Sequence, residues 1–508
     1  MILVLKSIRL TQNNIMNRIF RNINFKDHRP LLIILGVFAL IFCSISIVNH
    51  YNFRTYAWDL GIRNNAIFDY AHFRWNEGLL TYERFDNILS DHFQLLPILF
   101  SPLYWIFGSY SMLILQILSI LFGGTGIYFY IRKLSGSRKM ANLAIIHFFS
   151  LWGIYSALGF DFHDNVVGAM FVPWFLYFIR YDKWANASIM FVLILISKEN
   201  MSLWMFFIGL GLIVLHYKEI HKLKYISLFT VLALIYFLVI MKFIMPALAN
   251  ESREYIHFDY SALGNNFGEV IATILQRPGY IFSLLFENHL NISSAVGVKS
   301  ELHFVVLLSG GVFLFLKPQY LIMLIPIYAQ KLFNDDPGKW GINYQYSIEF
   351  APILTLVAFT WIIEYKNKKK HRLIAYLLVG LTIITTVSVL DKRVSTWYNS
   401  INHQFYKKNH YVRDFDVYCV HKILEKIPDD AIVSAQTMLV PHIAFRDRIY
   451  QYPDVSDAEY IVLLTADDNT YPLKKETYDK SIAKYKNDEE WDIFFENKFT
   501  LIFKRRFP

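Results

Sequence analysis

The strongest constraint on this chain is a series of apolar runs, 12 to 21 residues long, that are almost free of charged side chains. The hydrocarbon core of a bilayer is about 30 Å thick and needs roughly 20 helical residues to cross it. Hydrophobic residues make up 55% of the 508 residues, which a soluble all-α core of this length does not require. The sequence therefore predicts an all-α, multi-pass transmembrane helical bundle with about eleven spans. These spans are 31–48, 111–131, 140–158, 165–179, 186–197, 201–215, 225–245, 302–316, 318–330, 347–363 and 373–390.

Lys and Arg gather on one side of these spans. They are frequent in five segments, namely the N-terminal residues 1–30, "RKLSGSRK" (132–139), "RYDK" (180–183), "HYKEIHKLK" (216–224) and "KNKKKHR" (366–372). Cytoplasmic loops carry an excess of Lys and Arg. A cytoplasmic N-terminus places every one of these segments inside, and it leaves residues 31–391 as the transmembrane domain.

The same orientation places a long first loop, residues 49–110, on the outer face. Between 56 and 75 its apolar residues recur near helical spacing, which predicts an amphipathic helix at the membrane surface. Residues 95–107 are apolar but contain Pro97 and Pro102, so we expect an interfacial or re-entrant segment there rather than a span.

Four polar clusters fall on this outer side. They are Asp59, Asp91–His92, Asp161–His163–Asp164 in "GFDFHDN" (159–165), and Lys198–Glu199 in "SKENMS" (197–202). A single aspartate is more often a helix cap or a surface carboxylate, and Lys198–Glu199 suits a structural ion pair equally well. Recurrence on one side, at shallow depth in the membrane, favours a shared site.

Residues 392–508 have a different character. "DAIVSAQ", "RIYQYP" and "AEYIVLL" read as short buried strands, with a helix near "TMLVPHIAF" between the first two. "WDIFFENKFTLIFKRR" reads as a closing hairpin around Glu496–Asn497. We expect a small extracytoplasmic α/β domain here, with a task in acceptor recognition or lid support.

Several motifs resemble one family of predicted membrane proteins, known as domain of unknown function two-zero-seven-nine. They are "AWDLGIRNNAIF", "SDHFQLLPILFSPLYWIFG", "GFDFHDN", "SKEN", "VPHIAFRDRIYQYP" and "AEYIVLL", in this order. The family usually has Gln where this chain has Asn65 and Pro-Glu where it has Asp164–Asn165. The family in turn resembles the GT-C superfamily of integral-membrane glycosyltransferases, which carry a key acidic residue early in the first outward loop. Asp59 stands where that residue is expected.

The resemblance implies a protein of the bacterial inner membrane that transfers a sugar from a polyprenyl-phosphate-linked donor to an envelope acceptor. Such a transfer needs a base and cationic groups for the leaving phosphate. Asp59 is the expected base, with Asp161 and His163 as further catalytic candidates. The substrate-binding candidates are Arg54, Arg63, Asp91, His92, Asp164, Lys198, Glu199, His289, Tyr344 and Tyr346.

Two questions stay open from the residues. Asp161, His163 and Asp164 offer mixed oxygen and nitrogen ligands for Mg²⁺ or Mn²⁺, but a hydrogen bond between Asp161 and His163 without metal is favoured over a cation site. A transporter or flippase of lipid-linked sugars, or a non-catalytic envelope scaffold, are the alternatives to an enzyme. Polar clusters crowded on one side of the membrane disfavour the transporter. We expect no nucleic-acid partner.

Overall fold

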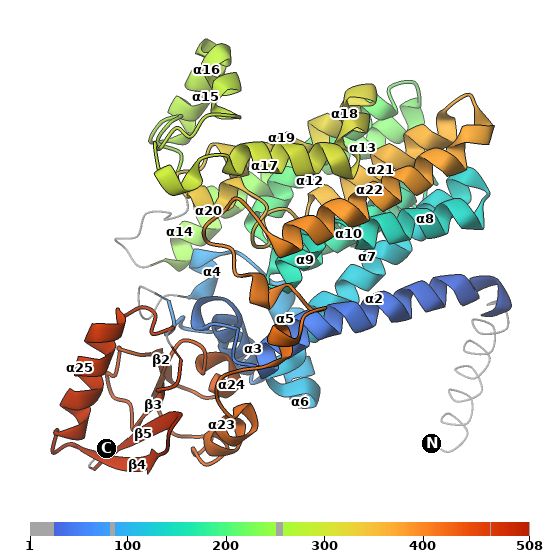
Figure 1. Ribbon diagram of the computed structural model, residues 1–508. Coiled ribbons are helices and arrows are strands. Elements are labelled where there is room, and N and C mark those ends of the chain that lie inside the picture. The colour runs from blue at the N-terminus through green and yellow to red at the C-terminus, as the bar shows by residue number, and fades with distance from the viewer. Residues whose placement is uncertain (1–24, 82–86, 250–257, 468, 507–508) are drawn as a thin grey trace, which may run out of the picture.

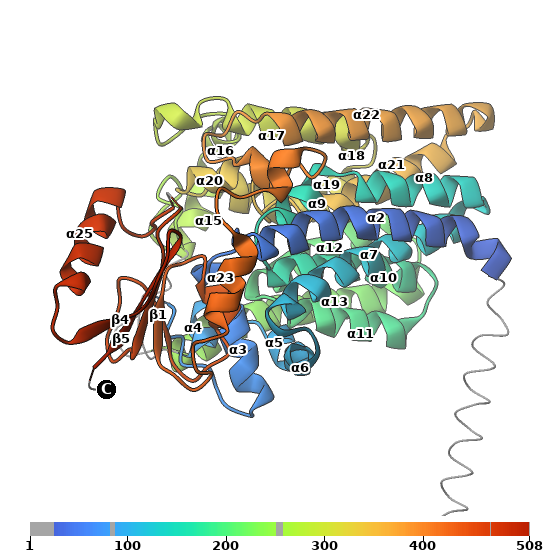
Figure 2. The same cartoon turned by 60° about the horizontal axis from the view of Figure 1, so that its bottom comes forward.

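The computed structural model describes residues 25–81, 87–249, 258–467 and 469–506. The predicted basic segment 1–30 therefore lies largely outside the described residues. Helices form one elongated body, and a small sheet lies beyond one end of it (Figures 1 and 2). The helices and turns of the first long loop lie between these two parts, in both views.

The body consists of long helices that run roughly side by side (Figure 1). They are α2 (Phe25–Tyr51), α7 (Ser111–Ser135), α8 (Arg138–Phe149), α9 (Trp152–Leu158), α10 (Asp164–Arg180), α11 (Trp184–Leu195), α12 (Glu199–Leu215), α13 (Ile220–Val239), α17 (Val298–Val306), α18 (Val312–Leu316), α19 (Pro318–Leu332), α21 (Phe350–Glu364) and α22 (His371–Asp391). The connecting segments contain further helices, namely α3 (Ile62–Ala71), α4 (Ile88–Asp91), α5 (Leu96–Phe100), α6 (Tyr104–Phe107), α14 (Met245–Leu248), α15 (Phe267–Gln276), α16 (Pro278–Leu284) and α20 (Pro337–Trp340).

Helices thus occupy most of each predicted span. By length and composition, five helices among the described residues suffice to cross a membrane, or six when the bent pair α8–α9 counts as one span. Three shorter apolar helices, α11, α12 and α21, come in addition. The multi-pass helical architecture is confirmed, whereas the number eleven and the side on which each end lies stay predictions.

The turn between α7 and α8 shows how the sequence sets these boundaries. Arg132 and Lys133 lie in the last turn of α7, where their charge complements the helix dipole. Gly136 follows with a left-handed φ of 66°, which ends the helix. The Ser137 side chain then accepts a hydrogen bond from the Met140 N–H and caps α8. One predicted basic loop is therefore a tight helix–helix turn.

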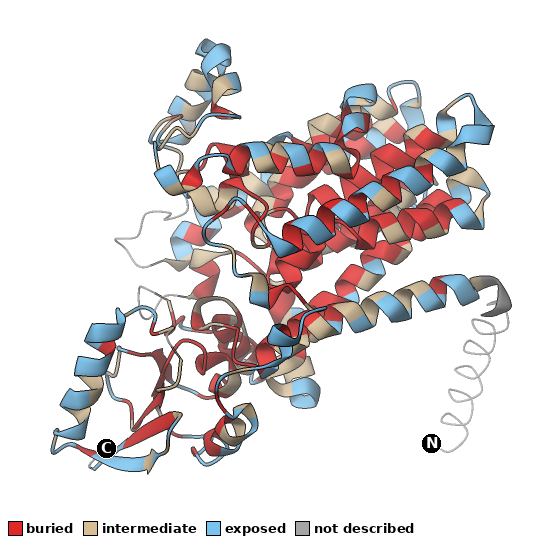
Figure 3. Ribbon diagram, viewed as in Figure 1, coloured by how far each residue is buried: buried red, intermediate tan, exposed pale blue. Residues whose placement is uncertain are grey.

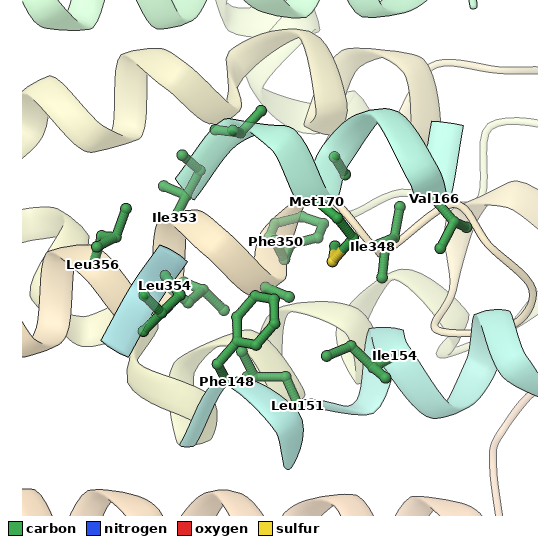
Figure 4. Close-up of a cluster of buried hydrophobic side chains, with 14 of the residues drawn as sticks. Phe148, Leu151, Ile154, Val166, Met170, Ile348, Phe350, Ile353, Leu354 and Leu356 are labelled. Atoms are coloured by element: carbon green, nitrogen blue, oxygen red, sulfur yellow. The ribbon is translucent and has the colours of Figure 1, made fainter. Parts of the chain in front are cut away.

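Close contact between α7 and α10 forms the centre of the body. A Cβ added at Gly123 would lie 2.8 Å from the Met170 sulfur, so the two helices approach each other through a position that only glycine fills. Apolar side chains around Phe148, Met170 and Phe350 fill the adjacent core, drawn from α8, α10 and α21 (Figure 4). Outward faces are apolar as well, for example at Leu40, Ile235 and Ile384, as suits contact with lipid.

The C-terminal part contains a five-stranded mixed sheet of order β2-β1-β3-β5-β4. Its strands are β1 (Val433–Ala435), β2 (Ile449–Gln451), β3 (Tyr460–Leu464), β4 (Trp491–Glu496) and β5 (Thr500–Arg505). Strand β1 pairs in parallel with β2 and β3, and β5 pairs antiparallel with β3 and β4. Helices α23 (Val417–Leu424), α24 (Val440–Ile443) and α25 (Lys475–Lys486) accompany the sheet. The predicted strands, the helix after the first of them and the closing hairpin are all present.

The first loop differs from the prediction in one respect. Helix α3 forms inside the predicted range 56–75, but it is not a surface helix, because eight of its ten residues are buried. Asn64 donates a hydrogen bond to the Pro441 carbonyl, and Asn65 donates to the carbonyls of Ala444 and Arg446. The C-terminal part therefore covers α3 and is tied to it through backbone carbonyls (Figure 3).

Candidate functional site

The turn between α9 and α10 is held by one amide side chain of α7. Gln116 Nε2 donates to the Asp161 carbonyl at 3.0 Å, and Gln116 Oε1 accepts from the His163 N–H at 3.0 Å. Asp161 has a positive φ of 38°, a conformation that costs energy in a residue with a side chain. Gln116 is fully buried and uses both ends of its amide, so it fixes the strained backbone that orients Asp161 and His163.

Asp161 faces the first loop. Its Oδ2 accepts hydrogen bonds from the backbone N–H groups of Tyr56, at 2.8 Å, and Leu60, at 3.5 Å. Tyr56 precedes the short helical turn η1 (Ala57–Gly61), which carries Asp59, and Leu60 lies within it. A carboxylate at the start of a helical turn satisfies N–H groups that have no partner inside the turn. Asp161 thus acts as a cap that positions Asp59.

His163 pairs with Asp59 rather than with Asp161. Its Nε2 lies 3.0 Å from Asp59 Oδ1. The imidazole also stacks on Phe160, with ring centroids 5.3 Å apart and an interplanar angle of 16°, which fixes its orientation. The Asp59 side chain is 30% exposed and that of His163 only 9%, so the aspartate is the more accessible member of the pair.

The surroundings favour the charged form of Asp59. Burial alone would raise its pKa, but the charge of His163 and its hydrogen bond, followed by the charges of Arg63 and Lys198, hold the pKa of Asp59 below its ordinary value. Asp161 behaves in the opposite way, because burial and then the charge of Asp59 raise its pKa. The pKa values of these two neighbouring carboxyl groups are therefore shifted in opposite directions, and Asp59 is the one held in the ionised form, which can accept a proton.

Asp164 and Arg63 form a separate ion pair behind this turn. Arg63 Nε lies 2.9 Å from Asp164 Oδ2, and the side-chain exposures are 11% and 0%. Arg54 also has protein partners, since its guanidinium donates hydrogen bonds to the backbone carbonyls of His410 and Val412. Both arginines, which the sequence suggested for phosphate, contact protein groups in this structure. Both tie the first loop to neighbouring segments.

His92 and Glu199 connect the first loop to the start of α12. His92 Nδ1 lies 2.9 Å from Glu199 Oε1, and the Phe93 N–H donates to Glu199 Oε2 at 3.0 Å. Glu199 therefore pairs with His92, and the predicted Lys198–Glu199 pair is replaced by a contact between distant segments. This contact keeps the first loop against the bundle next to Lys198. Asp91, one residue before His92, ends α4.

Lys198 opens onto a small pocket between α10, α12, α19 and the segment before α21. The pocket is lined by Asn165, Lys198, Asn200, Gln330, Lys331, Gln345, Tyr346 and Glu349. One wall is fixed by a hydrogen bond of 2.9 Å from Asn165 Nδ2 to Glu349 Oε1. Lys198 and Tyr346, which line the pocket, both interact electrostatically with Asp59, so this pocket adjoins the Asp59–His163 pair.

The three remaining candidates divide between two places. Tyr344 packs on Phe160, with ring centroids 4.5 Å apart, and Tyr346 lines the pocket, so both belong to the site. His289 belongs to another cluster, where it lies 3.1 Å from the Lys299 amine and packs on Trp340.

The side chains of Asp161, His163 and Asp164 contact three different partners, namely η1, Asp59 and Arg63. Among the described residues no group of three or more His, Cys, Asp and Glu side chains is placed to hold a metal ion. The turn is therefore arranged for hydrogen bonding in this structure, and the Mg²⁺ or Mn²⁺ site considered from the sequence does not form from these three residues.

Sequence reasoning missed Gln116, Lys331 and Glu349. Gln116 and Lys331 are polar residues within or directly after apolar runs, and polar groups at such depth are costly unless they have a task. That signal was present in the sequence for both. Nothing in the sequence pairs Glu349 with Asn165.

Comparisons with known proteins give a family and a likeness to several solved structures. The family model described as "Predicted membrane protein (DUF2079)" matches residues 49–498. The crystal structure of ArnT from Cupriavidus metallidurans bound to undecaprenyl phosphate is similar, with 12% sequence identity, a TM-score of 0.49 and coverage of 93% of this chain and 97% of that chain. No curated protein matches the chain. The family match covers η1, the turn 159–165, Lys198 and strands β1 to β4, so it includes every element of the site.

Proposed function

This chain belongs to the DUF2079 family of predicted membrane proteins, and on that premise we propose that it is an integral-membrane glycosyltransferase of the GT-C type. Its reaction moves a sugar from a polyprenyl-phosphate-linked donor to an acceptor of the cell envelope. The observation that carries this proposal is the pair Asp59–His163, a partly exposed carboxylate held by a histidine at the end of an apolar helix bundle. The ordered motifs resemble the DUF2079 family, and the resemblance of that family to GT-C enzymes supports the same reaction.

Asp59 serves as the general base. Its carboxylate takes the proton of an acceptor hydroxyl while that oxygen attacks the anomeric carbon of the donor sugar. The bond between the anomeric carbon and the phosphate oxygen breaks, and the polyprenyl phosphate leaves with the electron pair. His163 orients Asp59, and Asp161 fixes the helical turn η1 on which Asp59 lies.

We propose that this chemistry takes place at the outer face of the membrane, with residues 1–30 and 366–372 in the cytoplasm. The distribution of Lys and Arg supports this orientation. The sheet of residues 433–505 then lies outside, over the helical turn that carries Asp59. In that position it is placed to bind an envelope acceptor.

The test is a transfer assay with the full chain in membranes. Polyprenyl-phosphate donors with different radiolabelled sugars are supplied, and release of the sugar from lipid to acceptor or water is measured. Release above the level of membranes without the protein supports the proposal. Failure with every donor, at verified expression, would favour a transporter of lipid-linked sugars, which a flipping assay in proteoliposomes then measures directly.

A further inference from the structure

The pocket next to Asp59 and His163 contains an unsatisfied buried amine. Lys331 lies in the last turn of α19, its side chain is buried, and its Nζ has no hydrogen-bond partner among the described residues. Another buried lysine shows the usual arrangement. Lys299 Nζ donates to the carbonyls of Leu284 and Leu332, both at 2.6 Å, and lies over the Trp340 ring.

An unpartnered ammonium group is expensive in a protein interior, because it has lost its water and gained no acceptor. The charge of Lys331 interacts favourably with Glu349, but Glu349 already accepts the hydrogen bond of Asn165. The protein would be more stable with an apolar side chain at position 331. Retention of the lysine points to a ligand that completes its hydrogen bonds.

Other groups in the same pocket define the chemistry of this ligand. Lys198, half-buried at the mouth, adds a second positive charge, so the pocket holds two ammonium groups against the single carboxylate of Glu349. The amide oxygens of Asn200 and Gln345 are buried and also have no hydrogen-bond partner among the described residues. A fitting ligand accepts hydrogen bonds from lysines and donates hydrogen bonds to amide oxygens. A phosphate attached to a hydroxyl-bearing sugar does both.

We propose that this pocket, the lysine pocket, binds the sugar-phosphate end of the glycosyl donor. Lys331 and Lys198 bind the phosphate, and Asn200 and Gln345 accept hydrogen bonds from sugar hydroxyl groups. This assignment rests on the proposed function, since it names the part of the substrate that lies beside Asp59. It also accounts for the phosphate partner that Arg54 and Arg63 do not supply.

The test measures binding to the full-length chain in nanodiscs of phosphatidylcholine, by the shift of thermal unfolding. The probes are undecaprenyl phosphate and its glucose-linked form in the nanodisc, glucose 1-phosphate and inorganic phosphate in solution, and phosphatidylglycerol as an anionic phosphodiester lipid without a sugar. We expect undecaprenyl phosphate and glucose 1-phosphate to bind, and glucose 1-phosphate to bind more tightly than inorganic phosphate. Binding of inorganic phosphate without undecaprenyl phosphate, or equal binding of phosphatidylglycerol, would overturn the assignment.

Lys331→Met is the decisive variant. It should weaken binding of undecaprenyl phosphate at least about 30-fold, as expected for a buried charge partner, while the unfolding temperature without ligand stays equal or rises. Lys299→Met is the matched control, which should lower the unfolding temperature and leave affinity unchanged. Lys198→Met, at a half-buried position, should weaken binding about tenfold. If Lys331→Met lowers the unfolding temperature and Lys198→Met binds like the wild type, both lysines are structural and the proposal fails.

Failure of this assignment is distinguishable from failure of the proposed reaction. Binding that depends on Lys331, in a protein that transfers no sugar, would refute the glycosyltransferase and leave the lysine pocket established. Sugar transfer that Lys331→Met and Lys198→Met both retain at the wild-type rate would refute the lysine pocket and leave the reaction established.

Discussion

Replacement of Asp59 by asparagine tests the proposed base directly. Asparagine has nearly the same shape and keeps an oxygen 3.0 Å from His163 Nε2, but it does not accept a proton at neutral pH. Loss of a general base costs about 10²–10⁴-fold in rate, which is about 3–5 kcal/mol of transition-state stabilisation. The pair is partly exposed, so the change in folding free energy should be only about 1 kcal/mol.

The assay follows release of labelled sugar from a polyprenyl-phosphate donor at equal amounts of wild-type and variant protein. Asp447→Asn is the control, because Asp447 is an exposed carboxylate that pairs with Arg74 away from the site. We expect wild-type rates for the control and residual rates for Asp59→Asn, with similar unfolding temperatures. A wild-type rate in Asp59→Asn would refute the assignment of the base.

Three further results are expected. Arg63→Gln leaves the buried Asp164 without its ion-pair partner, so thermal unfolding should show a loss of about 3–5 kcal/mol in folding stability. The added change Asp164→Asn should restore part of this stability, and an unchanged melting curve for Arg63→Gln would contradict the prediction. Although burial raises the pKa of Asp59, His163 lowers it below the ordinary value, so the stability that ionised Asp59 contributes is present above about pH 4 and is lost as the pH falls through the lower folded pKa. Melting curves from pH 7 to pH 3 should show a smaller loss of stability in Asp59→Asn than in the wild type. A reporter fused at residue 450 should be active only outside the cytoplasm, and cytoplasmic activity would reverse the proposed orientation.

Hydropathy predicted the helices well, because each apolar run is longer than a typical loop and has clear polar ends. It did not settle how many helices cross the membrane. Helices α11 and α12 have 12 and 17 residues, and a helix of that length reaches only about 18–26 Å. Crossing then depends on tilt and on the packing of neighbours, which composition does not encode.

The placement of α3 was not predictable from its own residues for a similar reason. Its spacing of apolar side chains suits a membrane surface, but the C-terminal part covers it instead. The asparagines Asn64 and Asn65, which read as a polar face exposed to water, bind three backbone carbonyls of residues about 380 positions away. A polar face looks the same in sequence whether it meets water or another domain's backbone.

The candidate site was predictable as a group of residues and not as a set of pairs. The polar clusters on one side of the spans contain Asp59, His163 and Asp164, and the structure brings these together. Which carboxylate meets which cation depends on the backbone of the turn 159–164, where Asp161 takes a positive φ. Gln116 imposes that conformation from α7, about 45 residues earlier. A contact of this kind leaves no periodic signal.

The position of Asp59 depends on both parts of the molecule at once. The helical turn η1 is held from the bundle by Asp161, which accepts the N–H groups of Tyr56 and Leu60. From the other side the Thr437 hydroxyl accepts the Ala57 N–H at 3.3 Å, and Trp58 packs edge-on against Tyr471. The carboxylate therefore lies on a turn clamped between the bundle and the loops of the sheet. Because a displacement of about 1 Å is enough to impair catalysis, the C-terminal part is a structural component of the proposed catalytic unit as well as the proposed surface for the acceptor.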